Sequence, residues 1–252
     1  MLKARIPKLF KSMFAFAALT LASDQHVFGI DGKSILCVPD ADLDPLLKTY
    51  ADESTHLQPG SGHTPGFGFL FRPETMKSVI PGYVVVQGFE GHPYANALSG
   101  TVGFLDPNDR ARLGPAMRAR TIEDEWYARD QCPQPIIRPL PGTKLYEVKC
   151  STKADYATIW NRAPDPQITV PNPNDFVVAT CQYENIHLGP YAGKKLKNCA
   201  RVVIIDGFLV DYRFQEENVA AVPQIDSLIR EKLAQWKKNC SSPAKATTGF
   251  GK

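Results

Sequence analysis

The chain has 252 residues, of which 43% are hydrophobic and 22% are charged, an ordinary composition for a globular protein with one large domain or two small ones. Its formal net charge is +3, but four basic residues, Lys3, Arg5, Lys8 and Lys11, lie before Ser23, and without them 25 basic residues face 26 acidic ones. The remaining charge of about −1 gives no electrostatic reason to expect binding to nucleic acid or to an anionic membrane surface.

Residues 1–22 have the organisation of a secretory signal peptide. The basic start is followed by an uncharged stretch at 12–22, and small residues at Thr20 and Ala22 occupy the positions that a signal peptidase reads. The apolar core is shorter than the ~20 residues of a membrane-spanning helix, although an anchor that is never removed is the alternative. We therefore expect a periplasmic or secreted protein with no membrane span after removal of the signal peptide.

The first part of the mature chain predicts short strands and helices separated by polar loops. We expect strands at 33–38, 67–72, 83–87 and 101–105, the last two as a pair. A helix is expected at 44–51, a short one from Pro73, and a longer one at about 115–130. Residues 52–66 form a polar loop rich in glycine and proline.

The strongest structural pattern lies near the C-terminus, after expected strands at 144–149 and 176–183. Two apolar runs, 201–205 and 208–214, flank Asp206-Gly207, a pair that favours a tight hairpin turn. An amphipathic helix follows, with one apolar stripe made of Val222, Ile225, Ile229, Leu233 and Trp236. These elements predict an α+β fold in which amphipathic helices pack on one face of antiparallel sheet.

The order of elements divides the exported chain into an N-terminal half, 23–132, and a C-terminal half, 133–240, before a disordered tail at 241–252. In each half a glycine, a strand, acidic residues and a tryptophan-bearing helix lead to a cysteine. Gly100 precedes Cys132 by 32 positions and Gly207 precedes Cys240 by 33. Two similar α+β halves, with a proline-rich connector at 163–175, are an alternative that the sequence leaves open.

The six cysteines all lie in the exported part, and an even number in an oxidising compartment predicts disulfides. Six cysteines allow fifteen pairings, so the sequence does not fix the connectivity. Our prediction pairs Cys132 with Cys150, Cys181 with Cys199, and Cys37 with Cys240.

No arrangement of polar residues identifies a reaction. His56 and His63 share a loop with Glu53 and Ser61, but their spacing matches no helical ligand pattern. We therefore expect no catalytic residue, no cofactor and no metal, and a protein that is not an enzyme. A secreted hydrolase with a site near His56 and His63 is one alternative, and a periplasmic ligand-binding or structural module is another.

The C-terminal segment, with Asp206-Gly207-Phe208, Tyr212-Arg213-Phe214, Ile225-Asp226 and Trp236, resembles exported bacterial immunity proteins encoded beside type VI secretion effectors, particularly antibacterial phospholipases. The lipid-attachment cysteine of some members is absent after the apolar core. The resemblance implies a protein that occludes a toxin's active site and catalyses nothing. An acidic and aromatic loop, 56–67 or 88–94, would act as the plug, and its candidate partner-binding residues are His63, Phe67, Phe89, Glu90, His92 and Tyr94.

Overall fold

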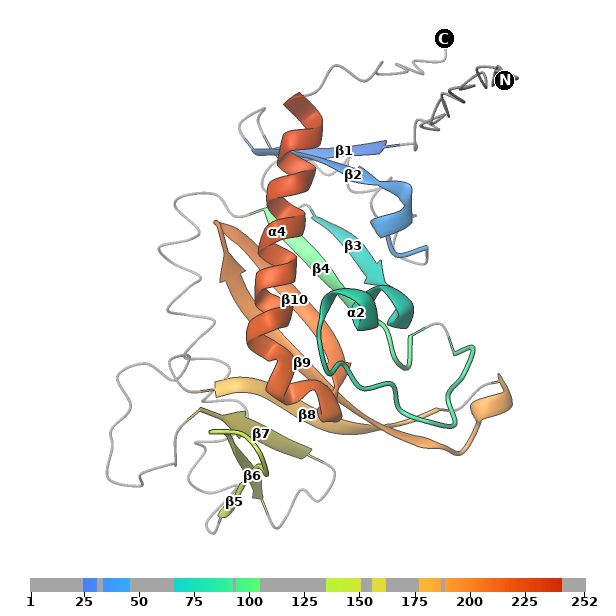
Figure 1. Ribbon diagram of the computed structural model, residues 1–252, viewed down its shortest axis with the longest axis vertical. Coiled ribbons are helices and arrows are strands. Elements are labelled where there is room, and N and C mark those ends of the chain that lie inside the picture. The colour runs from blue at the N-terminus through green and yellow to red at the C-terminus, as the bar shows by residue number, and fades with distance from the viewer. Residues whose placement is uncertain are drawn as a thin grey trace, which may run out of the picture.

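The computed structural model describes residues 25–30, 34–45, 66–92, 94–104, 135–150, 156–161, 177–186 and 189–241. This part of the chain forms two antiparallel sheets and a long helix, so the predicted α+β class is confirmed (Figure 1). The strands are β1 (Gln25–Ile30), β2 (Ser34–Pro39), β3 (Gly66–Phe71), β4 (Leu98–Phe104), β5 (Pro135–Pro139), β6 (Tyr146–Cys150), β7 (Tyr156–Trp160), β8 (Val177–Asn185), β9 (Lys195–Ile205) and β10 (Phe208–Gln215). The α-helices are α2 (Pro73–Val79) and α4 (Val222–Ser241), and short 3-10 helices are η1 (Asp40–Asp42), η3 (Gly189–Tyr191) and η4 (Glu216–Ala221).

The larger sheet has the strand order β3-β4-β10-β9-β8-β7-β6-β5, and every neighbouring pair is antiparallel. Strands β3 and β4 come from the predicted N-terminal half; β3 pairs with β4, and β4 pairs with β10 from the C-terminal half. Strands from both predicted halves therefore share one sheet.

The hairpin between β9 and β10 has the predicted turn. Asp206 and Gly207 both adopt positive φ, 48° and 88°, as a tight two-residue hairpin requires. Gly100 has a different role in β4: a side chain there would meet the Asp211 carbonyl oxygen at 2.3 Å and the ring of Phe69 at 2.8 Å. Only glycine lets β4 approach β10 this closely while Phe69 covers it.

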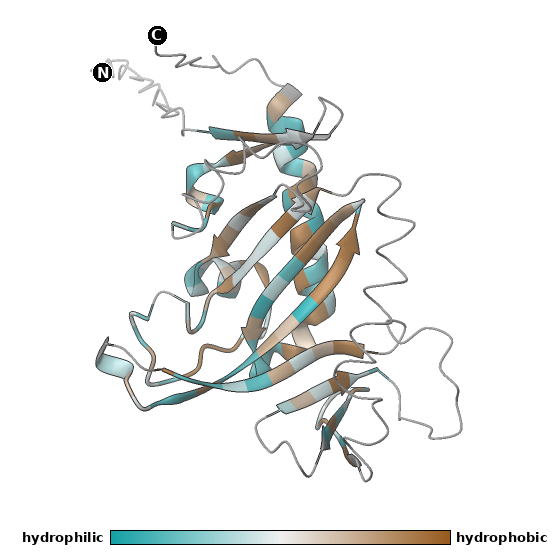
Figure 2. Ribbon diagram, turned by 180° about the vertical axis from the view of Figure 1, so that it is seen from behind, coloured by the Kyte–Doolittle hydropathy of each residue, from teal (hydrophilic) through white to brown (hydrophobic). Residues whose placement is uncertain are grey.

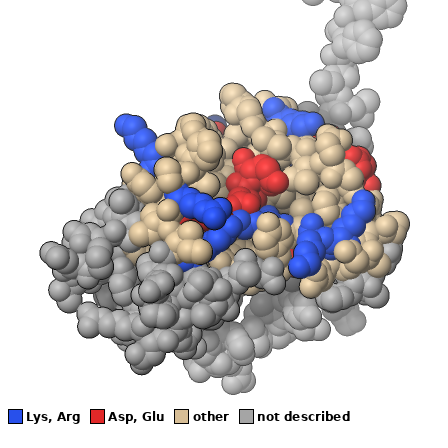
Figure 3. Space-filling view, turned by 90° about the horizontal axis from the view of Figure 1, so that it is seen from below, with Lys and Arg blue, Asp and Glu red and all other residues tan. Residues whose placement is uncertain are grey.

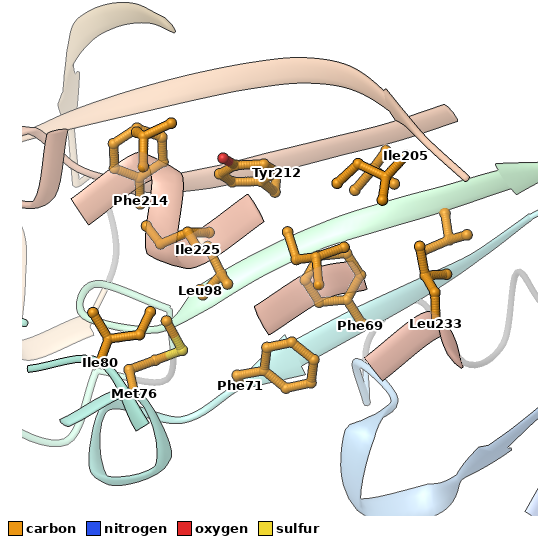
Figure 4. Packing of buried hydrophobic residues seen from close by; sticks show 14 of the residues in the cluster. Phe69, Phe71, Met76, Ile80, Leu98, Ile205, Tyr212, Phe214, Ile225 and Leu233 are labelled. Carbon is orange, nitrogen blue, oxygen red and sulfur yellow. The ribbon is translucent and has the colours of Figure 1, made fainter. Parts of the chain in front are cut away.

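The core lies between α4 and one face of the large sheet. All five residues of the predicted apolar stripe of α4 are buried: Val222, Ile225, Ile229, Leu233 and Trp236. Figure 4 shows Ile225 and Leu233 beside aromatic side chains of β3 and β10, including Phe69, Tyr212 and Phe214. The helix is therefore fixed by burial of its apolar stripe, as its periodicity predicts.

Two of the three predicted disulfides lie among the described residues. One joins Cys37 in β2 to Cys240 near the end of α4, and the other joins Cys181 to Cys199, which face each other across β8 and β9. The third predicted pair, Cys132 with Cys150, lies outside the residues whose side chains the structure describes. The first bond fastens the β1–β2 sheet to α4, and the second links the two longest strands.

The predicted strand at 83–87 is wrong. This segment has no strand partner, because side-chain amides bind its backbone instead: Asn218 accepts from the Val84 amide at 2.8 Å, and Asn96 accepts from the Val86 amide at 2.7 Å. Strands β1, β5 and β7 were not predicted, since each is short and lacks a clear alternation.

Several other predictions lie outside the described residues. These are the signal peptide, the loop at 52–65, most of the helix at 44–51, the helix at 115–130, the connector at 163–175 and the tail after residue 241. Within the described part, neither α2 nor α4 combines the length and the apolar character that crossing a bilayer demands.

Candidate protein-binding interface

The large sheet has a second face that α4 does not cover. Val210, Tyr212 and Phe214 of β10 point into the core beneath α4, so the alternation of the strand directs Leu209, Asp211 and Arg213 to the opposite side. Figure 2 shows this face from behind, with β9 and β10 in front of α4 and no other described helix or strand drawn over them.

We define the sheet patch as Thr101, Val202, Ile204, Leu209 and Asp211, which come from β4, β9 and β10. Asp211 lies opposite Val202 on one side and Thr101 on the other, while Ile204 lies opposite Leu209. Val202 is 44% exposed and Ile204 38%, unusually high values for branched aliphatic residues in central strands. The patch is therefore apolar surface around one carboxylate.

The surroundings of Asp211 shift the pKa of its carboxyl. Its side chain reaches solvent, but the surrounding sheet removes part of its hydration and raises the pKa of the carboxyl, while nearby Arg213 partly opposes this effect. A basic residue of a binding partner would stabilise the charged form of the Asp211 carboxylate. The patch is thus suited to a protein surface that presents a basic residue among apolar ones.

Beside the patch, the same face becomes polar and slightly hollow. A cavity of about 200 Å³ is lined there by Gln182, Glu184, Asn198 and Arg213, among other residues. There Asn198 donates to Glu184 at 2.8 Å, and Arg213 forms an ion pair with Glu184 at 3.4 Å. These groups bind one another, so they form a polar rim to the patch.

The far end of this face is closed by the loop that contains Phe89. Phe89 and Ala95 pack on Leu196, which lies on the same side of β9 as Val202 and Ile204. Lys194 donates to the Gly88 carbonyl and lies 5.4 Å from the centre of the Phe89 ring. These contacts hold the loop against the sheet.

The structure places two of the predicted partner-binding residues, Phe67 and Phe89, in buried positions. Phe67 is only 2% exposed and stacks on Phe28, with ring centres 4.5 Å apart, so it belongs to the core. Phe89 is buried under its own loop. Neither ring is an exposed anchor, because each already covers apolar surface of the chain itself.

The other predicted partner-binding residues have defined positions, apart from His63, which lies outside the described residues. His92 accepts the amides of Tyr94 and Ala95 through Nδ1, and the Tyr94 hydroxyl donates to Asp44 at 2.8 Å. Glu90 is exposed, and a hydrogen bond from the Gly88 amide lowers the pKa of its carboxyl. Phe89, Glu90, His92 and Tyr94 thus lie in one loop, and Glu90 is its exposed acidic residue.

A buried charged cluster lies on the core side of the sheet. Lys197 donates to Glu147 at 2.9 Å and also to Glu216, and Lys149 forms an ion pair with Glu147 at 2.9 Å. Burial opposes the charged forms, but these bonds outweigh it, so the pKa of Glu147 is lowered and that of Lys197 is raised. Figure 3 shows the lower face of the molecule, where basic side chains lie along one side of a central acidic group.

A second polar cluster, Arg201 with Asp226 and Tyr212, borders a cavity of about 450 Å³ between the sheet and the start of α4.

The remaining described histidine, His26, forms a hydrogen bond with Asp40 at 3.1 Å. His56, His63 and His187 lie outside the described residues. Within the described ranges, no three His, Cys, Asp or Glu side chains gather as a metal site would require.

No protein-family model and no curated protein matches this chain. Among solved structures, it is similar to an immunity protein of the Stenotrophomonas maltophilia type IV secretion system, with a TM-score of 0.42 and 10% sequence identity. The similarity covers 85% of this chain and 94% of that one.

Sequence patterns did not point to the sheet patch. Val202 and Ile204 belong to a continuous apolar run in which buried and exposed positions look alike, and only the pairing partners distinguish them. The alternation of residues 208–214 did indicate a solvent-facing side with Asp211, which is the one signal that could have located the patch.

Proposed function

We propose that this chain is an exported bacterial immunity protein. It binds a secreted antibacterial toxin, delivered by a type VI secretion system, and covers the toxin's active site without catalysing a reaction. The sheet patch carries this proposal, because it combines exposed apolar residues with one acidic residue on a face that no described helix covers. The resemblance of the C-terminal segment to immunity proteins encoded beside type VI effectors supports it.

The patch specifies the chemistry of the toxin surface. A Lys or Arg of the toxin, surrounded by apolar residues, would pair with Asp211 while its neighbours pack on Val202 and Ile204. Contact would exclude water around Asp211, and the cation would stabilise the charged carboxylate that the isolated protein disfavours. The polar rim at Glu184 and Arg213 would set the orientation.

The scaffold suits this role outside the cytoplasm. The disulfide between Cys181 and Cys199 joins the strand that carries Val202 to its neighbour. Disulfides persist in oxidising compartments, and a stiff sheet loses little freedom on binding. The predicted signal peptide would bring the protein to the same compartment as the incoming toxin.

The test is a competition between sibling strains. A strain that lacks this gene should be killed by its parent, but not by a parent whose type VI apparatus is inactive. The complete gene should restore survival, whereas a version without residues 2–22 should not. The toxin whose deletion in the parent abolishes killing should copurify with this protein in a one-to-one complex.

The role of the sheet patch is tested with charge reversal. Asp211→Arg should weaken toxin binding at least ~30-fold, because it places two cations in contact. Glu231→Arg makes the same charge change on an exposed position of α4 and should leave protection intact. Both proteins must unfold at temperatures close to the parent's for the comparison to count.

Distinct outcomes contradict distinct parts of the proposal. Survival of the deletion strain would refute immunity, and killing by a parent without its type VI apparatus would refute that delivery route. Full protection by Asp211→Arg would refute the sheet patch as the interface. Toxin-independent hydrolysis that is lost in His63→Ala would favour the hydrolase alternative.

A further inference from the structure

The cavity of about 450 Å³ lies on the other side of the sheet from the sheet patch. It is bordered by the turn between β5 and β6, by β8, and by the junction of η4 with α4. Leu145, Val178, Val219 and Val222 provide apolar walls. Its volume falls within the usual range of small-molecule sites, which are mostly apolar with a few placed polar groups.

The floor of this cavity carries no unbalanced charge. Asp226 accepts from Arg201 Nε at 3.2 Å, from Arg201 Nη2 at 2.9 Å and from the Tyr212 hydroxyl at 2.7 Å. The last Arg201 nitrogen, Nη1, donates to the Val178 carbonyl at 2.8 Å. Burial works against the charge on Arg201, but the bonds to Asp226 outweigh it and raise the pKa of the guanidinium, so the charge of Arg201 is matched by its carboxylate partner.

Lys144 adds the charge that distinguishes this cavity. It lines the cavity from the β5–β6 turn, its side chain is exposed, and it forms no ion pair or hydrogen bond with the residues that the structure describes. An ammonium group therefore stands beside apolar walls and a neutral floor. The combination matches a ligand with an apolar body and a single negative end.

We infer that this cavity binds a straight-chain carboxylate, with its alkyl chain between the valine walls and its carboxylate at Lys144. Burial of the chain provides most of the affinity, and the ion pair fixes the direction in which the ligand lies. The site is separate from the sheet patch and does not depend on the proposed immunity function.

The test is calorimetric titration of the folded exported protein with decanoate, decanol and decyltrimethylammonium, each below the concentration at which it forms micelles. Decanoate should bind most tightly and the cation least. Lys144→Gln should weaken decanoate about fivefold and leave decanol unchanged, since it removes only the exposed ion pair. Lys237→Gln removes the same charge from an exposed position of α4 and should change neither.

A second variant tests the apolar walls. Ala220 lines the cavity but is itself exposed, so Ala220→Trp should fill the space without disturbing the core, and should abolish binding of both decanoate and decanol. Asp211→Arg should leave decanoate binding unchanged, which separates this site from the toxin interface.

Three results would overturn the inference. These are no saturable binding of decanoate, equal loss of decanoate affinity in Lys144→Gln and Lys237→Gln, or binding that survives Ala220→Trp. Loss of toxin protection in Ala220→Trp, without any decanoate binding by the parent, would assign the cavity to the toxin instead.

Discussion

The indole nitrogen of Trp236 donates a hydrogen bond to the carboxylate of Asp42 at 2.9 Å, although 194 positions separate the two residues. Lys232, one turn earlier in α4, forms an ion pair with the same carboxylate at 3.0 Å. Together with the disulfide between Cys37 and Cys240, these contacts attach β2 and the following η1 to α4. The beginning and the end of the described chain are thus held as one unit.

We expect Asp42→Ala to lower the free energy of unfolding by about 2 kcal/mol. The change leaves the buried Trp236 N–H without its acceptor and removes the partner of Lys232. Glu231→Ala, on an exposed position of α4, should change stability by less than ~0.5 kcal/mol. Urea denaturation measures both, and equal stability of the two variants would contradict a structural role for Asp42.

The two described disulfides should contribute unequally. The bond between Cys37 and Cys240 closes a loop of 203 positions, and that between Cys181 and Cys199 one of only 18. In the chain-entropy model these loops correspond to about 5 and about 3 kcal/mol. Replacing each pair by alanines and comparing thermal denaturation should therefore give the larger loss for Cys37 and Cys240. The reverse order would show that contacts around Cys181 and Cys199 matter more than loop length.

The buried cluster around Lys197 should show strong coupling. Lys197→Met should destabilise the protein by about 2–4 kcal/mol, because Glu147, whose side chain is only 9% exposed, loses one of its two cations. Adding Glu147→Gln should recover part of that loss, since the buried charge of Glu147 is then removed. The double-mutant cycle measures the coupling, and simple additivity of the two changes would contradict a direct interaction.

Asp211 predicts a pH dependence of stability. Its pKa in the folded protein is raised above the ordinary value of 3.8, so it stabilises the fold at low pH, and this contribution is lost as the pH rises through the folded-state pKa. Asp211→Asn cannot titrate. Its stability relative to the parent should therefore increase with pH from about 3.8 until the carboxyl is fully charged. Denaturation curves across this range test the sign, and a relative stability that falls with pH would show that the pKa is lowered.

The predicted partner-binding loop shows what composition leaves undecided. Phe89 and Glu90 are adjacent, yet one is buried against Leu196 and the other is exposed. The composition identifies an acidic and aromatic loop, but the fold of the loop determines which of its side chains are exposed to solvent. For the same reason Phe67, assigned to the predicted plug, proved to be a core residue.

Elements whose signals are local could be predicted from the order of the residues. The turn at Asp206 and Gly207 depends on two backbone dihedrals, and the apolar stripe of α4 depends on the helical period, so both were predictable. The folded chain was needed to show that β4 lies beside β10, and hence that Thr101, Val202 and Asp211 share one surface. Strand pairing joins residues far apart in the chain, and no local pattern records which strands will meet.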